Sequence, residues 1–155
     1  MIIATLLITV DSCLPVGGCQ NAGMPRTVIT FGTFDVFHVG HLRVIERAAA
    51  LGDRLVVGVS ADELNLRKKG REPVFSQGER MAIVAALKPV HEVFVEESLE
   101  LKRDYITEYA ADVLVMGDDW AGKFDEFEDI CEVVYLPRTP AISTTALIEK
   151  ISATG

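Results

Sequence analysis

Short apolar runs alternate with amphipathic stretches along this chain from residue 26 onward. The apolar runs, several of them rich in β-branched residues, predict strands at 28–31, 55–59, 90–95, 113–116 and 133–136. The amphipathic stretches predict helices at 41–51, 76–87, 99–109 and 143–151, with a short helical turn at 62–66 and a short helix after residue 123. Strands that alternate with helices predict a parallel sheet covered on both faces, which is a three-layer, doubly wound α/β fold.

Local signals mark two of the helix starts. Ser76 is followed three residues later by Glu79, which is the spacing of a capping box, and Pro89 ends the helix that begins there. Either Ser143 or Thr144 is expected to cap the last helix. A polar loop is predicted at 67–75, and it contains Lys68, Lys69 and Arg71.

The first 23 residues do not share this alternating pattern. Residues 2–10 are apolar, but a membrane span needs roughly 20 apolar residues. No basic region precedes the apolar run and no small-residue cleavage site follows it, so we do not expect a signal peptide. We expect residues 1–23 to be a disordered or dispensable extension, with an additional edge strand as the alternative, and residues 24–155 to form one domain.

Composition narrows the class of protein. The chain has 155 residues, of which 49% are hydrophobic and 25% charged, as in soluble globular domains. Its formal net charge of -8 argues against nucleic acid as a partner, since nucleic-acid binding needs a basic face. The net charge does not exclude a small anionic ligand. The three cysteines lack zinc-site spacing and are expected to be reduced thiols in a cytoplasmic protein.

Three segments that suit phosphate binding follow predicted strands, at 32–41, 117–123 and 138–145. Ligands of doubly wound folds bind outside the carboxyl ends of the strands, so these segments are expected to converge at one edge of the sheet. In the first segment, His38 and His41 flank Gly40 at a strand-to-helix junction. Backbone N–H groups at a helix start favour an anion, and the imidazoles add donors for a phosphate transition state.

The other two segments add groups for a nucleotide. Arg138 can bind phosphate oxygens through two hydrogen bonds, and hydroxyls follow it at a second helix start, on Ser143, Thr144 and Thr145. Carboxylates suited to Mg²⁺ are carried by Asp35, Asp118 and Asp119. Trp120 either stacks on a base or packs in the core, and the cluster at 68–71 either reaches a phosphate or forms a solvated face.

The motifs resemble the glycerol-3-phosphate cytidylyltransferases, a family of H-x-G-H nucleotidyltransferases with a Rossmann-like fold. The resemblance is carried by residues 30–41 (TFGTFDVFHVGH), 116–124 (MGDDWAGKF) and 134–145 (VYLPRTPAISTT), and it extends from about residue 24 to the end of the chain. It implies that the phosphate of glycerol 3-phosphate attacks the α-phosphorus of CTP in line, giving CDP-glycerol and pyrophosphate with Mg²⁺ as cofactor. It also implies a homodimer.

The resemblance assigns roles by position. It implies a catalytic role for His38, His41, Lys68 and Arg138. The resemblance also implies a group of residues that bind the nucleotide: Gly32, Thr33, Phe34, His38, His41, Asp119, Arg138, Thr139, Ser143 and Thr144. The acceptor would be bound by Asp35, Arg80 and Trp120, and Asp35 is also the candidate metal ligand.

The chain departs from the family pattern at several positions, which leaves other functions open. Ala141 stands where the family often has glycine, Lys88 and His91 stand where an arginine and an aspartate are expected near the dimer interface, and the loop at 70–76 carries about one extra residue. The alternatives are an adenylyltransferase that uses ATP, a cytidylyltransferase for another polyol or amino-alcohol phosphate, and a nucleotide-binding module without catalysis.

Overall fold

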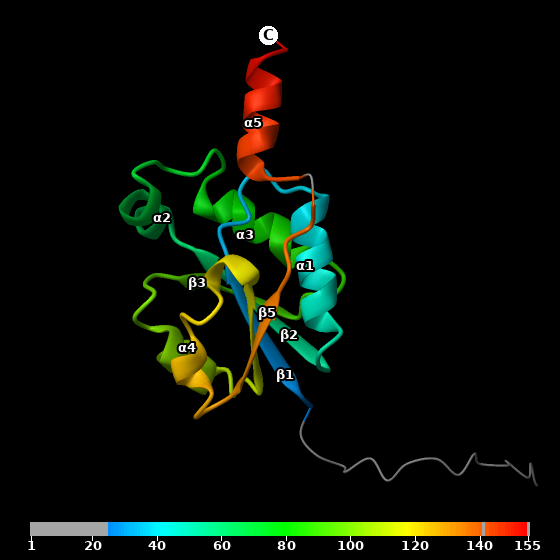
Figure 1. The fold of residues 1–155 in the computed structure, drawn as a ribbon, viewed down its shortest axis with the longest axis vertical. Helices are drawn as coiled ribbons and strands as arrows, with labels where there is room; N and C mark the ends of the chain where they lie inside the picture. Colours follow the sequence, from blue (N-terminus) through cyan, green and yellow to red (C-terminus); the bar gives the residue numbers. More distant parts are fainter. Residues whose placement is uncertain (1–24, 141, 155) are drawn as a thin grey trace, which may run out of the picture.

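One parallel sheet organises the computed structural model, which describes residues 25–140 and 142–154. Its strands are β1 (Thr27–Gly32), β2 (Arg54–Ser60), β3 (Glu92–Glu96), β4 (Val113–Gly117) and β5 (Glu132–Leu136). They lie in the order β3-β2-β1-β4-β5, and every neighbouring pair is parallel (Figure 1). All five predicted strands are confirmed, with small shifts at their ends.

Helices cover both faces of this sheet, so the predicted three-layer α/β fold is also confirmed. On one face, α1 (Val39–Ala49) and α3 (Gln77–Ala85) pack against buried valines of β2 and β4. On the other face, α4 (Lys102–Glu108) and the 3₁₀ helix η2 (Asp125–Phe127) pack against apolar residues of β1 and β4. The apolar runs of β1, β2 and β4 are buried almost throughout because helices lie on both sides of them.

Helix α2 (Asp62–Lys69) is longer than the predicted turn at 62–66, and part of the predicted loop at 67–75 is therefore helical. Acidic residues in its first turn and basic residues in its last turn complement the helix dipole. Gly70 ends the helix with a φ of 67°, a left-handed conformation that glycine adopts without strain. The prediction failed because charge pattern and the C-terminal Gly70, rather than apolar spacing, stabilise this helix.

Other boundaries follow from local hydrogen bonds. The capping box of Ser76 and Glu79 is present at the start of α3, as predicted. Helix α1 begins at Val39 rather than at 41, because the His38 side chain caps it. The last helix, α5 (Thr144–Ser152), is capped by Ser143, whose Oγ accepts a hydrogen bond from the Ala146 N–H at 3.2 Å.

Helix α5 differs from the others because it projects from the body of the molecule (Figure 1). None of its residues is buried, and Ile151 is 66% exposed. Its first turn, by contrast, lies at the cavity described below.

Part of the sequence interpretation concerns residues that the structure does not describe. The expected extension at 1–23, with Cys13 and Cys19, and the departure at Ala141 lie outside the described residues. Cys131 is buried and carries a free thiol. Across residues 25–140 and 142–154, we find no helix with the length and apolar character of a membrane span.

Candidate active site

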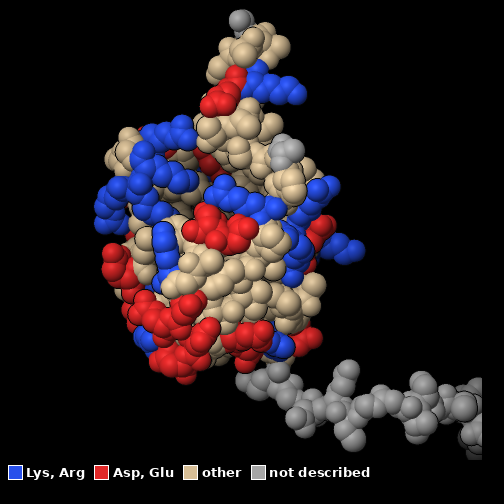
Figure 2. Space-filling model, viewed as in Figure 1, with Lys and Arg blue, Asp and Glu red and all other residues tan. Residues whose placement is uncertain are grey.

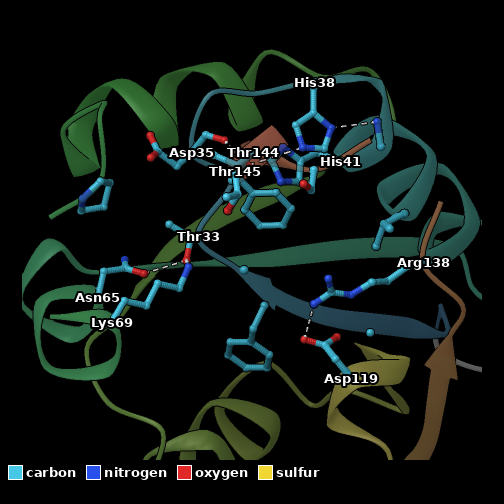
Figure 3. Close-up of a pocket in the computed structure, with 18 of the residues that line it drawn as sticks. Thr33, Asp35, His38, His41, Asn65, Lys69, Asp119, Arg138, Thr144 and Thr145 are labelled. Atoms are coloured by element: carbon cyan, nitrogen blue, oxygen red, sulfur yellow. Dashed lines mark hydrogen bonds and ion pairs between the residues drawn. The ribbon is translucent and has the colours of Figure 1, made fainter. Parts of the chain in front are cut away.

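A cavity of about 480 Å³ opens where β1 and β4 end. At this point the strand order reverses, since β1 pairs with β2 on one side and with β4 on the other. Ligands of doubly wound sheets bind at such switch points, and the volume suits a small-molecule ligand. The three predicted segments converge here, together with residues of α2 and of the loop that follows it (Figure 3).

The cavity brings together most of the residues that the sequence singled out. Its lining includes Gly32, Thr33, Phe34, Asp35, His38, Gly40, His41, Asp119, Trp120, Arg138, Thr139, Ser143, Thr144 and Thr145. Two predicted residues, Lys68 and Arg80, are not part of the lining. The convergence of segments that are about 100 residues apart in sequence is a consequence of the sheet order.

His38 and His41 lie beside each other at the start of α1. The His38 Nδ1 accepts a hydrogen bond from the Gly40 N–H at 3.0 Å, and the two imidazole rings stack with centroids 3.9 Å apart. Gly40 is required for this arrangement, because a Cβ atom there would lie 2.8 Å from the His38 ring and 2.9 Å from Ile142 Cγ2. The motif therefore needs glycine for close packing between two parts of the site.

The environment of the two histidines keeps both rings neutral at pH 7. Burial lowers the pKa of His41 to about 4, with a further contribution from His38, and burial also lowers the pKa of His38. Since the His38 Nδ1 accepts a hydrogen bond, its proton is assigned to Nε2, which lies 3.5 Å from Thr144 Oγ1. The buried His41 Nδ1 has no hydrogen-bond partner among the described residues, which suits an atom that meets a ligand.

The depressed pKa of His41 predicts acid sensitivity of the fold. An unfolded chain protonates histidine near pH 6.5, whereas folded His41 takes a proton only near pH 4, so acidification within this window favours unfolding. We expect the free energy of unfolding to fall by about 1–2 kcal/mol more between pH 7 and pH 5 in the wild type than in His41→Gln. Urea denaturation at both pH values measures this, and equal losses in the two proteins would contradict it.

The loop from Gly32 to His38 is held in a strained conformation. Phe34 and Val36 have φ angles of 53° and 44°, which are unfavourable for side chains of their size. The Asp35 carboxylate accepts hydrogen bonds from the N–H groups of Val74 and Phe75 at 2.8 and 3.0 Å. Asp35 thus ties this loop to the loop that follows α2, and two oxygen atoms of the candidate metal ligand are already engaged.

The opposite end of the cavity is lined by residues that follow β4 and β5. An Arg138 guanidinium N–H donates to Asp119 Oδ2 at 2.8 Å (Figure 3). Trp120 lies beside this pair in the cavity wall, and the ammonium groups of Lys68 and Lys123 lie 5.4 and 4.9 Å from the centre of its ring. This end combines an aromatic face, a cation and a carboxylate, which are suitable partners for a nucleoside.

The structure corrects the expectation that Arg80 contacts the acceptor directly. Its side chain is fully buried, and its guanidinium donates hydrogen bonds to three carbonyl oxygens and one carboxylate, those of Phe75, Thr33, Ser60 and Asp62. Buried arginine is stable only with such partners. Arg80 therefore positions the backbone around the cavity and has no donor that is directed at a ligand.

The structure also corrects the expectation for Lys68. It lies on helix α2 rather than in a loop, and its ammonium faces the Trp120 ring. Lysine 69, the next residue, lines the cavity with Asn65 and Arg71. Lys69 and Arg71 belong to the cluster at 68–71, for which phosphate binding was one of two expectations, but neither was assigned a role. Asn65 was missed, although a polar residue between two leucines offered a signal.

Charge is distributed unevenly over the molecule. Basic residues border the hollow, while acidic residues gather on the side away from α5 (Figure 2). The cations of the lining are Lys69, Arg71 and Arg138. The lining also carries the carboxylates of Asp35, Glu72 and Asp119, and Asp119 pairs with Arg138. The cavity of a chain with a net charge of -8 thus holds equal numbers of cations and carboxylates.

Comparison with known proteins agrees with this geometry. The Cytidylyltransferase-like family model matches residues 29–150. The glycerol-3-phosphate cytidylyltransferase of Bacillus subtilis is 50% identical over 127 residues, covering 82% of this chain and 98% of that protein. The protein of the same name from Staphylococcus aureus is 38% identical and covers 81% of this chain and 95% of its own length.

A solved structure with a related fold supports the architecture alone. The lipopolysaccharide core biosynthesis protein from Thermoplasma volcanium superposes with a TM-score of 0.64 at 24% identity, covering 75% of this chain and 99% of that chain. The family model spans more than half of the chain, and the curated relatives match over nearly their whole length. The chain therefore belongs to the cytidylyltransferase-like family.

Proposed function

We propose that this chain transfers a cytidylyl group from CTP to glycerol 3-phosphate, giving CDP-glycerol and pyrophosphate. The observation that carries the proposal is the placement of His38 and His41 beside the start of α5, so that two helix starts face one cavity. Two such helix starts suit a polyphosphate. The choice of cytidine and of glycerol 3-phosphate is supported by the curated relatives, which carry that name.

In this proposal the protein acts by positioning and by stabilising charge. An oxygen of the acceptor phosphate forms a bond to the α-phosphorus of CTP, and the bond to the bridging oxygen of the β-phosphate breaks, so pyrophosphate leaves with the electron pair. Neutral His38 and His41 donate N–H groups to the phosphate oxygens as charge shifts. Arg138, Thr139, Ser143 and Thr144 bind the nucleotide, with Asp119 and Trp120 at the nucleoside end.

We also propose Mg²⁺ as the cofactor. No three His, Cys, Asp or Glu side chains in the described part of the chain lie close enough to hold a metal ion by themselves. Mg²⁺ is commonly held by one or two carboxylates together with substrate phosphates, so this donor set fits an ion that binds with the nucleotide. Asp35 is the proposed carboxylate, since its oxygens retain lone pairs beyond the two N–H groups that they accept. The ion would neutralise charge on the phosphates.

A homodimer in the cytoplasm is part of the same proposal. The sheet ends at β3, and a groove between α3 and β3 is lined mainly by apolar residues, among them Met81, Val90 and Val93. Lys88 and His91, the positions that depart from the family pattern near its dimer interface, lie in or beside this groove.

A pyrophosphate-release assay tests the function directly. Purified protein with Mg²⁺ is given CTP or ATP, each with glycerol 3-phosphate, ribitol 5-phosphate or an amino-alcohol phosphate. We expect kcat/KM to be at least about tenfold higher for CTP with glycerol 3-phosphate than for the other combinations, and the same preparation to scatter light as a dimer. Turnover with ATP alone would favour the adenylyltransferase, and nucleotide binding without turnover would favour the non-catalytic module.

A further inference from the structure

The Thr33 hydroxyl lies between two polar side chains of α2, at the side of the cavity away from Arg138 and Asp119 (Figure 3). It donates a hydrogen bond to Asn65 Oδ1 at 2.7 Å, and the Lys69 ammonium donates to Thr33 Oγ1 at 3.3 Å. Thr33, Asn65 and Lys69 all belong to the cavity lining. The hydroxyl that follows β1 is therefore held by two side chains of a different element.

Asn65 determines the direction of the Thr33 hydroxyl. The Asn65 Nδ2 donates to the carbonyl oxygens of Ser60 and Ala61 at 3.2 and 2.9 Å, so the amide oxygen is the atom that faces Thr33. An amide oxygen only accepts hydrogen bonds, and the Thr33 hydroxyl must therefore be the donor. Asn65 is 1% exposed, and a buried amide with partners for its donors and its oxygen resists reorientation.

The Thr33 oxygen consequently presents lone pairs, and no proton, to the cavity. A hydroxyl oxygen has two lone pairs, and the Lys69 ammonium uses one of them. A ligand atom that binds the other lone pair must carry an O–H or N–H group. An ionised phosphate oxygen does not fit there, because it only accepts hydrogen bonds.

We propose that Asn65 is a positioning residue for Thr33, whose oxygen accepts a hydrogen bond from a hydroxyl of the acceptor alcohol. This inference rests on the proposed cytidylyltransferase function, in which both glycerol 3-phosphate and the ribose of CTP carry hydroxyls. Arg138 and Asp119 mark the nucleoside end of the cavity, and Thr33 lies away from them (Figure 3). The acceptor is therefore the source of the hydroxyl, and an acceptor without one leaves this site unpaired.

The test compares glycerol 3-phosphate with propyl phosphate, which has the same reactive phosphate and no hydroxyl. The measured quantity is the ratio of the two kcat/KM values. We expect Thr33→Val to lower this ratio by about fivefold or more, the effect of one lost hydrogen bond, while Thr33→Ser keeps it within about twofold. Thr30→Val is the matched control, since the Thr30 hydroxyl donates to the Val115 carbonyl oxygen at 2.9 Å. Its ratio should stay within about twofold of the wild type.

Two variants of Asn65 test the positioning role. Asn65→Asp still offers an oxygen to the Thr33 hydroxyl and should keep the ratio within about twofold, although its Tm falls because two donors are lost. Asn65→Leu removes the acceptor atom and should lower the ratio by about threefold or more. Both acceptors are measured on one preparation, so the fraction of folded protein cancels from the ratio. A ratio in Asn65→Leu equal to that of the wild type would overturn the positioning role.

Replacing CTP with its 2′-deoxy and 3′-deoxy analogues distinguishes the two sources of the hydroxyl. If Thr33→Val removes the discrimination between CTP and a deoxy analogue and leaves the acceptor ratio unchanged, the partner is the ribose and the assignment to the acceptor is overturned. If neither ratio changes, the Thr33 oxygen serves Lys69 alone, which also overturns the inference.

A binding measurement separates this inference from the proposed reaction. Calorimetric titration of each acceptor into the protein without CTP should show the same dependence on Thr33, as the ratio of the two dissociation constants. A ratio that depends on Thr33 without any pyrophosphate release would support the hydroxyl site and contradict only the proposed reaction.

Discussion

Replacing His41 with alanine should lower kcat for pyrophosphate release by about 10²–10³, with a change of less than about threefold in the KM for CTP. The loss of one donor to a developing negative charge has effects of this size, equivalent to about 2.7–4 kcal/mol. His41 is in a position to act as such a donor because its ring is neutral at pH 7, and its buried Nδ1 lacks a partner among the described residues. Steady-state assays with saturating acceptor measure the effect.

A second variant separates hydrogen-bond donation from the other effects of losing the imidazole ring. His41→Asn keeps a neutral N–H donor and should retain more activity than His41→Ala, although the geometry is changed. Far-UV circular dichroism and thermal unfolding of both variants exclude a general loss of fold. A rate within about threefold of wild type in His41→Ala would remove this histidine from the mechanism.

Replacing Lys102 with methionine should lower the free energy of unfolding by about 3–5 kcal/mol, the usual result when one partner of a buried ion pair is removed. Lys102 pairs with Glu96, and both side chains are 1% exposed. Glu96 also accepts a hydrogen bond from the Ser60 hydroxyl at 2.6 Å, and the Lys102 ammonium lies 3.6 Å from the centre of the Phe31 ring. The variant would leave the Glu96 charge buried without a counter-ion.

The double variant Glu96→Gln/Lys102→Met is the control for this explanation. Without a buried charge it should recover much of the lost stability, since uncharged replacements of a buried pair are often tolerated. Urea denaturation at pH 7 gives all three free energies. A loss below about 1 kcal/mol in Lys102→Met would show that Glu96 is compensated in another way.

Strands were easier to predict than helices in this chain, for a physical reason. A strand with helices on both faces must be apolar throughout, so the runs that became β1, β2 and β4 are continuous in sequence. Helix α2 is stabilised by charges at its ends and by Gly70, and its apolar positions are too few to show a helical period. The sequence therefore predicted only a turn there.

The site could be predicted where a short motif determines it and not where tertiary contacts do. His38, Gly40 and His41 interact within a few residues, so their placement at a helix start could be predicted from sequence. Lys68 and Lys69 are neighbours that face different directions on α2, and only the packing of the helix decides which one lines the cavity. The partners of Arg80 come from three separate segments, which sequence spacing does not reveal.

The first turn of α5 lines the candidate site, so a ligand that binds there would stabilise this helix. An isolated helix of fewer than about 12 residues is only marginally stable in water, and none of the nine residues of α5 is buried. A nucleotide that binds the first turn of α5 together with α1 would stabilise the helical state by mass action, by about 2.7 kcal/mol at a concentration one hundred times its Kd. Under the proposed function, helix formation in α5 and occupancy by CTP are thus a single linked equilibrium.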